Sequence, residues 1–121
     1  MKVEELEIYK LANQIGDSIW EIVLKWNYFV KNGLGRQWTD AADSIDSNIS
    51  EGFGRLSAKD NRRFYLFARG SLYETINDLN KAFRRNLVDE PTFKRLESEC
   101  LNLKVKLWNY IKALEMNIDN Q

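Results

Sequence analysis

Two glutamates, Glu51 and Glu74, are the residues of this sequence whose type could support acid–base chemistry. A carboxylate pair can serve a hydrolase, but such a site normally also contains a histidine, metal ligands or a nucleophile. The sequence has no histidine and one cysteine, so the commonest general base and the usual His/Cys metal sites are missing. The Glu-x-x-His motifs of ferritin-like metal centres are missing as well. We therefore expect a protein that is not an enzyme, needs no cofactor and has no evident small-molecule substrate.

An amide interrupts the apolar stripe of the segment that contains Glu51. Spacings of 4, 3 and 4 place these residues on one helical face: Ala41, Ile45, Asn48 and Gly52. A buried polar group must find a hydrogen-bond partner or cost about 1–3 kcal/mol. We therefore expect this face to dock against one specific neighbour.

Polar side chains of two consecutive helices could satisfy one another as a buried clamp. Glu51 and Arg55 have the i, i+4 order that favours a helical ion pair. In an antiparallel hairpin they would face polar residues of the next helix, and the complete polar clamp is Asn48, Glu51, Arg55, Arg69, Ser71 and Glu74. Gly52 and Gly70 would let the two backbones approach closely. We interpret the polar clamp as a structural device that fixes helix register or a subunit contact, and a catalytic Glu51–Glu74 pair is the less favoured alternative.

The chain is locally basic around its expected third helix. The whole sequence has 18 basic and 18 acidic residues, whereas residues 57–87 carry seven basic and three acidic side chains. Four cations at the start of this segment form a basic cluster: Arg55, Lys59, Arg62 and Arg63. Cations at a helix N-terminus oppose the helix dipole, so we expect an anionic partner. We favour carboxylates of a neighbouring subunit, and the alternative is RNA or DNA phosphates bound without sequence preference.

Four helices are expected to position these residues. The first helix is expected over residues 8–31, because apolar spacings of 4 and 3 run to residue 29 and the glycine-rich residues 32–35 should end it. The second helix is expected over about residues 39–54. A threonine or an aspartate at residues 39–40 can cap the second helix. The seam of the first helix is Ile8, Ala12, Ile15, Ile19, Ile22, Trp26 and Phe29.

The last two helices have clearer boundary signals. Ser57 and Asp60 have the spacing of a capping box at the start of a third helix, which we expect to be the short one and to close at residues 86–88. Asp89 or Glu90 can cap the fourth helix, since Pro91 is favoured in a first turn. The third seam is Tyr65, Ala68, Leu72, Thr75, Leu79 and Ala82, and the fourth is Phe93, Leu96, Cys100, Leu103, Leu107, Tyr110 and Leu114.

These elements predict an all-α protein, an up-down-up-down antiparallel four-helix bundle that forms a single domain over residues 1–121. Apolar residues beside the first and fourth seams exceed what one bundle interior needs. They are Trp20, Val23, Val30, Leu101, Val105, Trp108 and Ile111. We favour a homo-oligomer over a thicker monomer core as their explanation. The single cysteine, the acidic N-terminus and the lack of a long apolar run favour a cytoplasmic protein that does not enter the membrane.

Residues 44–55 and 68–74 also resemble a family signature. They read Ser-Ile-Asp-Ser-Asn-Ile-Ser-Glu-Gly-Phe-Gly-Arg and Ala-Arg-Gly-Ser-Leu-Tyr-Glu, with Ser57, Lys59 and Phe64 between them. In order and spacing they are similar to the 23S rRNA intervening-sequence four-helix bundle proteins. That family usually has proline, alanine and glutamate at the positions of Asp46, Ser50 and Asp60, and these departures are mild.

The resemblance implies a bacterial, non-enzymatic bundle that assembles into a ring-shaped homo-oligomer, with five subunits as the expected number. The cellular role of such proteins is not established. Similar bundles are accessory proteins to reverse transcriptases in diversity-generating elements, where nucleic acid is a partner. The sequence therefore favours an oligomeric interaction protein, with RNA or DNA binding as the alternative function.

Overall fold

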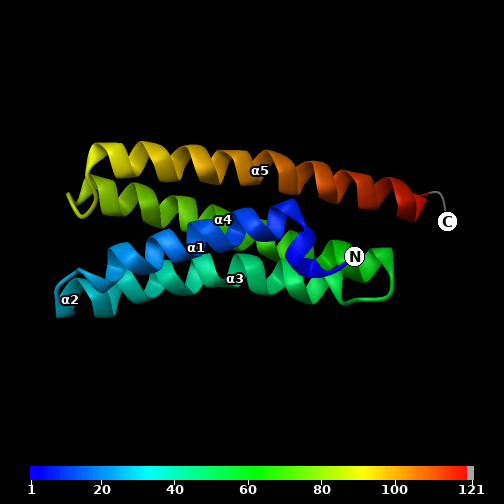
Figure 1. The fold of residues 1–121 in the computed structure, drawn as a ribbon, viewed down its shortest axis with the longest axis horizontal. Helices are drawn as coiled ribbons and strands as arrows, with labels where there is room; N and C mark the ends of the chain where they lie inside the picture. Colours follow the sequence, from blue (N-terminus) through cyan, green and yellow to red (C-terminus); the bar gives the residue numbers. More distant parts are fainter. Residues whose placement is uncertain (120–121) are drawn as a thin grey trace.

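Four long helices run alternately in opposite directions in the computed structural model, which describes residues 1–119 (Figure 1). They are α1 (Glu7–Leu24), α3 (Arg36–Phe53), α4 (Ala58–Arg84) and α5 (Glu90–Asp119). The short elements are the 3-10 turn η1 (Val3–Glu5), the single turn α2 (Tyr28–Val30) and the π-helical segment η2 (Lys31–Gly35). The described residues contain no strand, so the predicted all-α class is confirmed.

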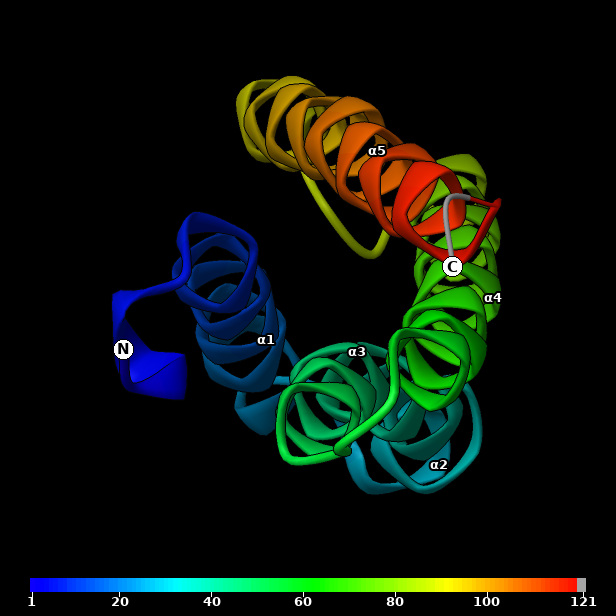
Figure 2. The ribbon, with the colours of Figure 1, turned by 90° about the vertical axis from the view of Figure 1, so that its right-hand side faces the viewer.

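The helices form a bundle in which each is antiparallel to the next. In the view along the bundle, α3 lies between α1 and α4, and α4 lies between α3 and α5 (Figure 2). The contact of α3 with α4 is the most extensive, and that of α1 with α5 is the least extensive of the four neighbouring pairs. This arrangement is the predicted up-down-up-down four-helix bundle. None of the helices in residues 1–119 combines the length and the apolar character needed to cross a bilayer.

The core follows the predicted seams most closely in α4. All six predicted residues of this seam are buried, from Tyr65 to Ala82. In α5 the core ends on Ile111, which is fully buried although it was expected beside the seam. Val23 of α1 is likewise buried, so neither residue belongs to a surplus apolar face. The other members of that set on α1 and α5 are exposed: Trp20, Leu101, Val105 and Trp108.

The connection between α1 and α3 differs from the prediction. The helix α1 ends at Leu24, not at residues 32–35, and Asn27 starts a new turn by accepting a hydrogen bond from the Val30 amide at 3.1 Å. From there η2 continues directly into α3, so no cap forms at residues 39–40. The change of direction also removes Phe29 from the seam, and its side chain is 87% exposed.

Gly35 explains why this glycine-rich segment does not end a helix. A Cβ at Gly35 would lie 2.7 Å from Cγ1 of Val23, so the glycine allows close packing of η2 against α1. Its backbone is right-handed helical, and no glycine in the described residues has a positive φ. A glycine is needed at residue 35 because η2 packs closely against α1, and not because a helix ends there.

The boundaries of α4 and α5 have the predicted chemistry, although α4 is long. It has 27 residues, which corrects the expected short third helix. Ser57 accepts the Asp60 amide at 3.1 Å, and Asp89 accepts the Thr92 amide at 2.9 Å. Hydrogen bonding by the Thr92 side chain, and then by the Thr92 amide, lowers the pKa of Asp89. At the end of α4, Asn86 has a φ of 60°, and the amide of Leu87 reaches back to the carbonyl of Ala82 at 2.8 Å, as in a Schellman motif.

Candidate functional site

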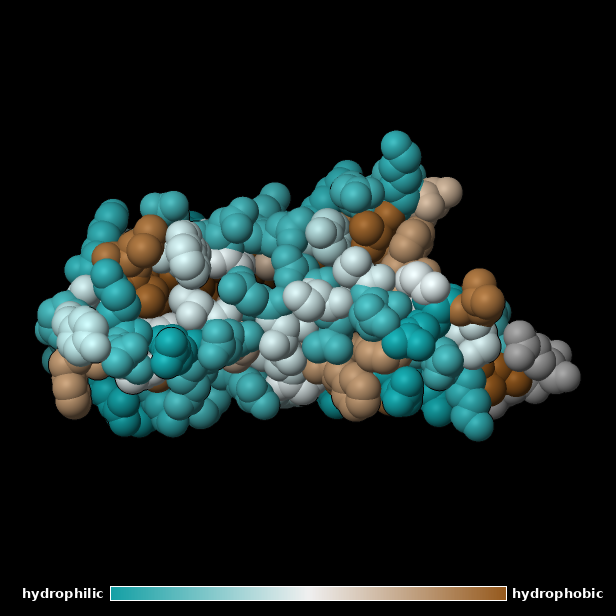
Figure 3. Space-filling view, turned by 90° about the horizontal axis from the view of Figure 1, so that it is seen from below, coloured by the Kyte–Doolittle hydropathy of each residue, from teal (hydrophilic) through white to brown (hydrophobic). Residues whose placement is uncertain are grey.

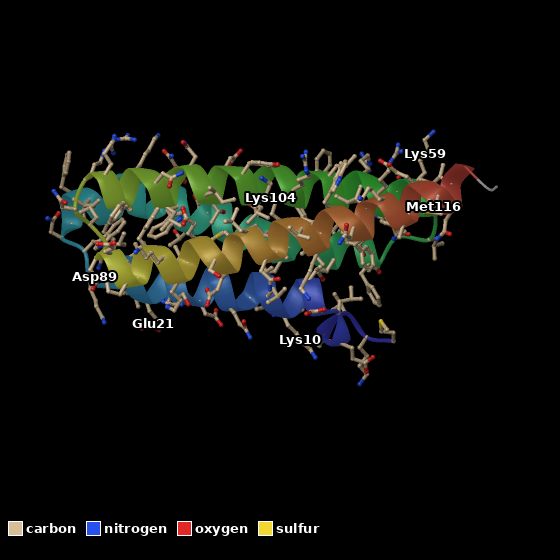
Figure 4. The ribbon with its side chains drawn as sticks, turned by 90° about the horizontal axis from the view of Figure 1, so that it is seen from above. Lys10, Glu21, Lys59, Asp89, Lys104 and Met116 are labelled. Carbon is tan, nitrogen blue, oxygen red and sulfur yellow. The ribbon has the colours of Figure 1, made fainter. Side chains whose placement is uncertain are left out.

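The turn between α3 and α4 carries the basic cluster at one end of the bundle, where Figure 4 labels Lys59. The turn is held by Asn61, whose side-chain amide donates to the carbonyls of Gly52 and Arg55. These bonds satisfy the carbonyl of Gly52 near the C-terminal end of α3 and that of Arg55 in the turn that follows it. The first turns of α4 are thereby fixed against the end of α3, so the four cations share one end of the molecule.

Two cations of the basic cluster already have carboxylate partners within the chain. Arg55 lies 2.5 Å from Glu51, and Nε of Arg63 lies 3.7 Å from Asp60. The two guanidinium groups also lie 4.5 Å and 4.8 Å from the ring centroid of Phe64. Both ion pairs are exposed, so each is expected to contribute only about 0–1 kcal/mol to stability.

The other two cations, Lys59 and Arg62, form no ion pair within residues 1–119. Lys59 is exposed. Arg62 is half-buried, and its Nε is shielded from solvent without a hydrogen-bond partner among the described residues. The cluster therefore has a net positive charge after its own carboxylates are counted.

The first half of the predicted polar clamp is satisfied by residues of α3 and of the turn that follows it. Asn48 donates to the carbonyl of Ser44 at 2.8 Å, and Glu51 pairs with Arg55 one turn further on. The side chain of Glu51 is 54% exposed, so the predicted burial of this residue was wrong. The reason is the exact phase of the helix, because Ile49 and not Asn48 occupies the fully buried position.

The α4 half of the polar clamp does not reach α3. Arg69 donates to the hydroxyl of Tyr73 at 3.2 Å, while Ser71 accepts at its carbonyl from the Thr75 hydroxyl and Glu74 is exposed. A Cβ at Gly70 would meet nothing within 4 Å, so no backbone approaches there. Within residues 1–119 no hydrogen bond or ion pair joins the two halves, and the predicted clamp is not formed inside the protomer.

Other residues fix the contact between α3 and α4. A Cβ at Gly52 would lie 3.1 Å from Cβ of Phe64 and 3.2 Å from the carbonyl oxygen of Asn61, so the predicted close approach is confirmed at this glycine. Further along, the indole of Trp38 donates to the carbonyl of Thr75 at 3.1 Å, and both residues are fully buried. These contacts perform the register-fixing role that was assigned to the polar clamp.

A buried carboxylate on α4 was not predicted. Asp78 is 1% exposed and accepts a hydrogen bond from the Gln37 amide at 2.7 Å, while its second oxygen has no partner among the described residues. Burial raises the pKa of Asp78. The sequence contained one signal, since residue 78 follows Thr75 by three positions and borders the buried seam, but a helical aspartate is more often exposed.

The outer surface between α4 and α5 contains a cavity of about 300 Å³, which we call the α4–α5 groove. Its lining is Arg69, Lys104, Val105, Trp108 and Asn109. The Arg69 guanidinium lies 4.8 Å from the Trp108 ring and 4.9 Å from the Tyr73 ring, and Nζ of Lys104 lies 5.1 Å from the same tyrosine ring. Figure 4 shows Lys104 where α4 and α5 run side by side. The groove is therefore apolar and cationic.

The surface between α1 and α3, the α1–α3 groove, carries carboxylates toward its middle and has Lys31 and Arg36 at its α2 end. Two cavities of about 310 Å³ each lie along it. The first is lined by Trp20, Val23, Leu24, Lys31, Asn32, Arg36, Thr39 and Asp40, and the second by Tyr9, Asp46, Ser47, Ser50 and Glu51. Figure 3 shows apolar side chains gathered toward the α2 end of this face, with hydrophilic ones around them.

Carboxylates crowd the middle of the α1–α3 groove. Asp43 lies close to Gly16, since a Cβ on that glycine would be 3.4 Å from its Oδ1. Burial raises the pKa of Asp43, and the charges of Asp40 and Asp17 raise it further. The pKa of Asp46 is raised by burial and then by the charge of Asp43. These like charges repel one another in the isolated protomer.

Two observations bear on catalytic and metal chemistry. Burial raises the pKa of the Cys100 thiol to about 12, which leaves almost no thiolate near neutral pH. In residues 1–119, no group of three or more His, Cys, Asp or Glu side chains is arranged to hold a metal ion.

A protein-family model, described as 23S rRNA-intervening sequence protein, matches residues 4–109 of this chain. The matched range begins in η1 and extends through most of α5, so it includes the basic cluster and both grooves. No curated protein matches the chain.

Proposed function

The chain belongs to the family of 23S rRNA-intervening sequence proteins, and we propose that it functions as a non-enzymatic homo-oligomer that assembles into a ring, with five subunits as the expected number. In this role the assembled surface, and not a catalytic centre, is the functional unit.

Exposed apolar side chains on two sides of the protomer are the observation that carries the proposal. On α5, Leu101, Val105 and Trp108 form one such surface, and on α1 the side chains of Trp20 and Leu24 are each about half exposed. Large apolar side chains that cluster on a small domain usually mark a partner surface, and tryptophan is enriched at interfaces. A ring would remove both surfaces from water in every subunit.

The placement of the titratable groups supports a non-enzymatic role. Glu51 is engaged with Arg55 on α3, whereas Glu74 lies exposed on α4 without a partner in the described residues. The single thiol is buried in the core. Neither arrangement supplies the converging acid, base and nucleophile that a hydrolytic site requires.

Light scattering and sedimentation of the purified chain test the assembly. At micromolar concentration we expect a mass about five times that of the 14.3 kDa protomer. A Val105→Asp, Trp108→Asp double variant should be smaller, because it places two charges on the exposed apolar surface of α5. Leu56→Asp is the matched control, since Leu56 is fully exposed at the α3–α4 turn and lines neither groove. A wild-type chain that stays monomeric at all concentrations contradicts the proposal.

A second candidate function is nucleic-acid binding through phosphates. The observation in its favour is the net positive charge of the basic cluster, where Lys59 and Arg62 lack ion-pair partners in the described residues. A ring would repeat this cluster in every subunit and so multiply a weak contact. Phe64, the aromatic side chain between Arg55 and Arg63, is already covered by their guanidinium groups, which argues for phosphate contact and not for base stacking.

Titration of labelled single-stranded RNA and duplex DNA at two salt concentrations tests this second function. We expect binding that ignores sequence and weakens steeply with salt, and each phosphate contact removed should reduce the logarithmic salt slope by about 0.7–0.9. The Arg62→Ala, Arg63→Ala double variant is the comparison. Absence of binding at low salt, or binding unchanged in the double variant, would leave subunit contact as the better explanation of the cluster.

A further inference from the structure

The two grooves lie on opposite sides of the bundle. Around the bundle the helices follow the order α1, α3, α4, α5, so the pair α1 and α3 forms one side and the pair α4 and α5 forms the other (Figure 2). A protomer with two different adhesive surfaces on opposite sides associates head to tail, and such contacts close into rings when the rotation allows. The positions of the grooves therefore suit a head-to-tail contact better than a two-fold dimer.

The cations of the α4–α5 groove lack carboxylate partners. Arg69 and Lys104 are held by aromatic rings, and among the described residues that line the groove none is acidic. A guanidinium group over an aromatic ring keeps its hydrogen-bond donors free at the edge of its plane. Arg69 uses one of these donors for Tyr73, and the others can donate to a carboxylate that arrives from outside.

The α1–α3 groove supplies carboxylates that lack cations. Asp17, Asp40, Asp43 and Asp46 follow this side of the bundle, and burial, followed by their mutual repulsion, raises the pKa of Asp43 and Asp46. Lys31 and Arg36 line the α2 end of the groove, so the excess of negative charge lies toward its middle. Cations from another molecule would relieve this repulsion.

Apolar side chains accompany the charges in both grooves. Trp20 and Leu24 line the α1–α3 groove, and Val105 and Trp108 line the α4–α5 groove. All four are exposed in the protomer. The apolar area of the α4–α5 groove therefore lies beside cations alone, whereas that of the α1–α3 groove lies between Lys31 and Arg36 at the α2 end and the aspartates toward the middle.

From this complementarity we infer that the ring proposed above is built from one heterologous contact, in which the α4–α5 groove of one copy receives the α1–α3 surface of the next. Arg69 and Lys104 meet the aspartates of the neighbouring copy, and Trp108 packs beside its Trp20 and Leu24. The occupant of each groove is thus a second copy of this chain. The inference rests on the proposed homo-oligomer and specifies its interface.

Mixing two variants tests the head-to-tail geometry. The first variant, Val105→Asp with Trp108→Asp, blocks the α4–α5 groove, and the second, Trp20→Asp with Leu24→Asp, blocks the α1–α3 groove. Each variant alone should be a monomer. An equimolar mixture should form a heterodimer of twice the protomer mass and nothing larger, because only one intact pair of surfaces is left. All four side chains are exposed, so circular dichroism and thermal melts should show that both variants remain folded.

Charge reversal tests the pairing of the residues. Arg69→Glu with Lys104→Glu should dissociate the oligomer, as should Asp43→Lys with Asp46→Lys. A mixture of these two variants should again assemble beyond a dimer, because one contact keeps its original charges and the other has both signs exchanged.

The results distinguish this inference from the proposed function. If each blocked variant alone forms a homodimer, each groove pairs with its own kind, and the heterologous contact is wrong. If the wild type is an oligomer and all the variants assemble like it, the interface lies elsewhere and only the inference fails. A monomeric wild type would remove both the proposed function and the inference.

Discussion

The contacts of α3 with α4 and of α1 with α5 close the same bundle by different means. Between α3 and α4, the backbones approach at Gly52, and the indole of Trp38 bonds the Thr75 carbonyl in a fully buried position. Between α1 and α5, the polar links are the ion pair of Glu7 with Lys106 at 2.6 Å, whose side chains are both exposed, and a hydrogen bond from Arg95 to the Ser18 hydroxyl at 3.4 Å. One contact depends on packing and backbone groups, and the other depends on the ends of long side chains.

Open space accompanies the looser contact. A cavity of about 470 Å³ lies between the last turns of α1 and the start of α5, and one of about 430 Å³ lies between the first turn of α1 and the middle of α5. Contacts with few buried groups contribute less to stability and open more readily. We conclude that α3 and α4 form the rigid part of the protomer. In contrast, α1 and α5 are held together mainly by the connecting segments at their ends and by the core that all four helices share.

The largest expected effect is in the tight contact. Trp38→Ala should lower the free energy of unfolding by about 3–5 kcal/mol, because it removes a fully buried indole and leaves the Thr75 carbonyl without its partner. Phe29→Ala is the matched aromatic control. Its side chain is 87% exposed, so its loss should be about 0.5 kcal/mol or less. Urea denaturation at one fixed protein concentration measures both, and equal losses would show that the comparison is wrong.

Effects of intermediate size on stability, opposite in sign to each other, are expected at Gly52 and Gly70. Gly52→Ala should destabilise the protein by about 1–3 kcal/mol, because its Cβ would press against Phe64, Tyr65 and the Asn61 carbonyl. The same change at Gly70 meets open space and should stabilise α4 by about 0.4–1 kcal/mol. Thermal melts of the two single variants give the signs. A stabilising Gly52→Ala would mean that the two helices are not closely packed at this point.

The smallest effects are expected at the exposed ion pairs. Glu7→Ala removes the pair between α1 and α5, and Glu51→Ala removes the pair with Arg55 at the end of α3; each should cost about 0–1 kcal/mol. A loss of about 3–5 kcal/mol in the free energy of unfolding for Glu51→Ala would instead support the buried polar clamp predicted from the sequence. Both variants can be compared with wild type by urea denaturation at low and at high salt, where the losses should shrink as salt rises.

Much of the fold could be predicted because helix signals are local. Ser57, Asp89 and Pro91 mark helix starts through hydrogen bonds and backbone angles that involve only a few neighbouring residues. The seam of α4 was predicted completely, since 3.6 residues per turn fixes which side chains share a face. The prediction failed at residues 25–35, where a break in α1 and a π-helical turn change the phase of the pattern.

The site was predicted less well because polar side chains are long and can choose among partners. From the sequence we predicted that six residues form the polar clamp. In the structure Asn48 instead forms a hydrogen bond within its own helix, and Arg69 contacts the aromatic rings of Tyr73 and Trp108. Asp78, a buried aspartate that contacts Gln37, was missed. A shift of one residue in helical phase decides between these outcomes, and periodicity alone does not resolve it.

The sequence by itself determined the helical class, the antiparallel order of the four helices, most of the core and the presence of excess apolar and basic side chains. These features follow from spacing and composition, which are properties of the chain alone. Only the tertiary structure decided that Gly52 and not Gly70 lies against another helix, and that acidic and basic grooves occupy opposite sides. Both depend on the rotation of each helix about its axis, which is set by the packing of all four helices together.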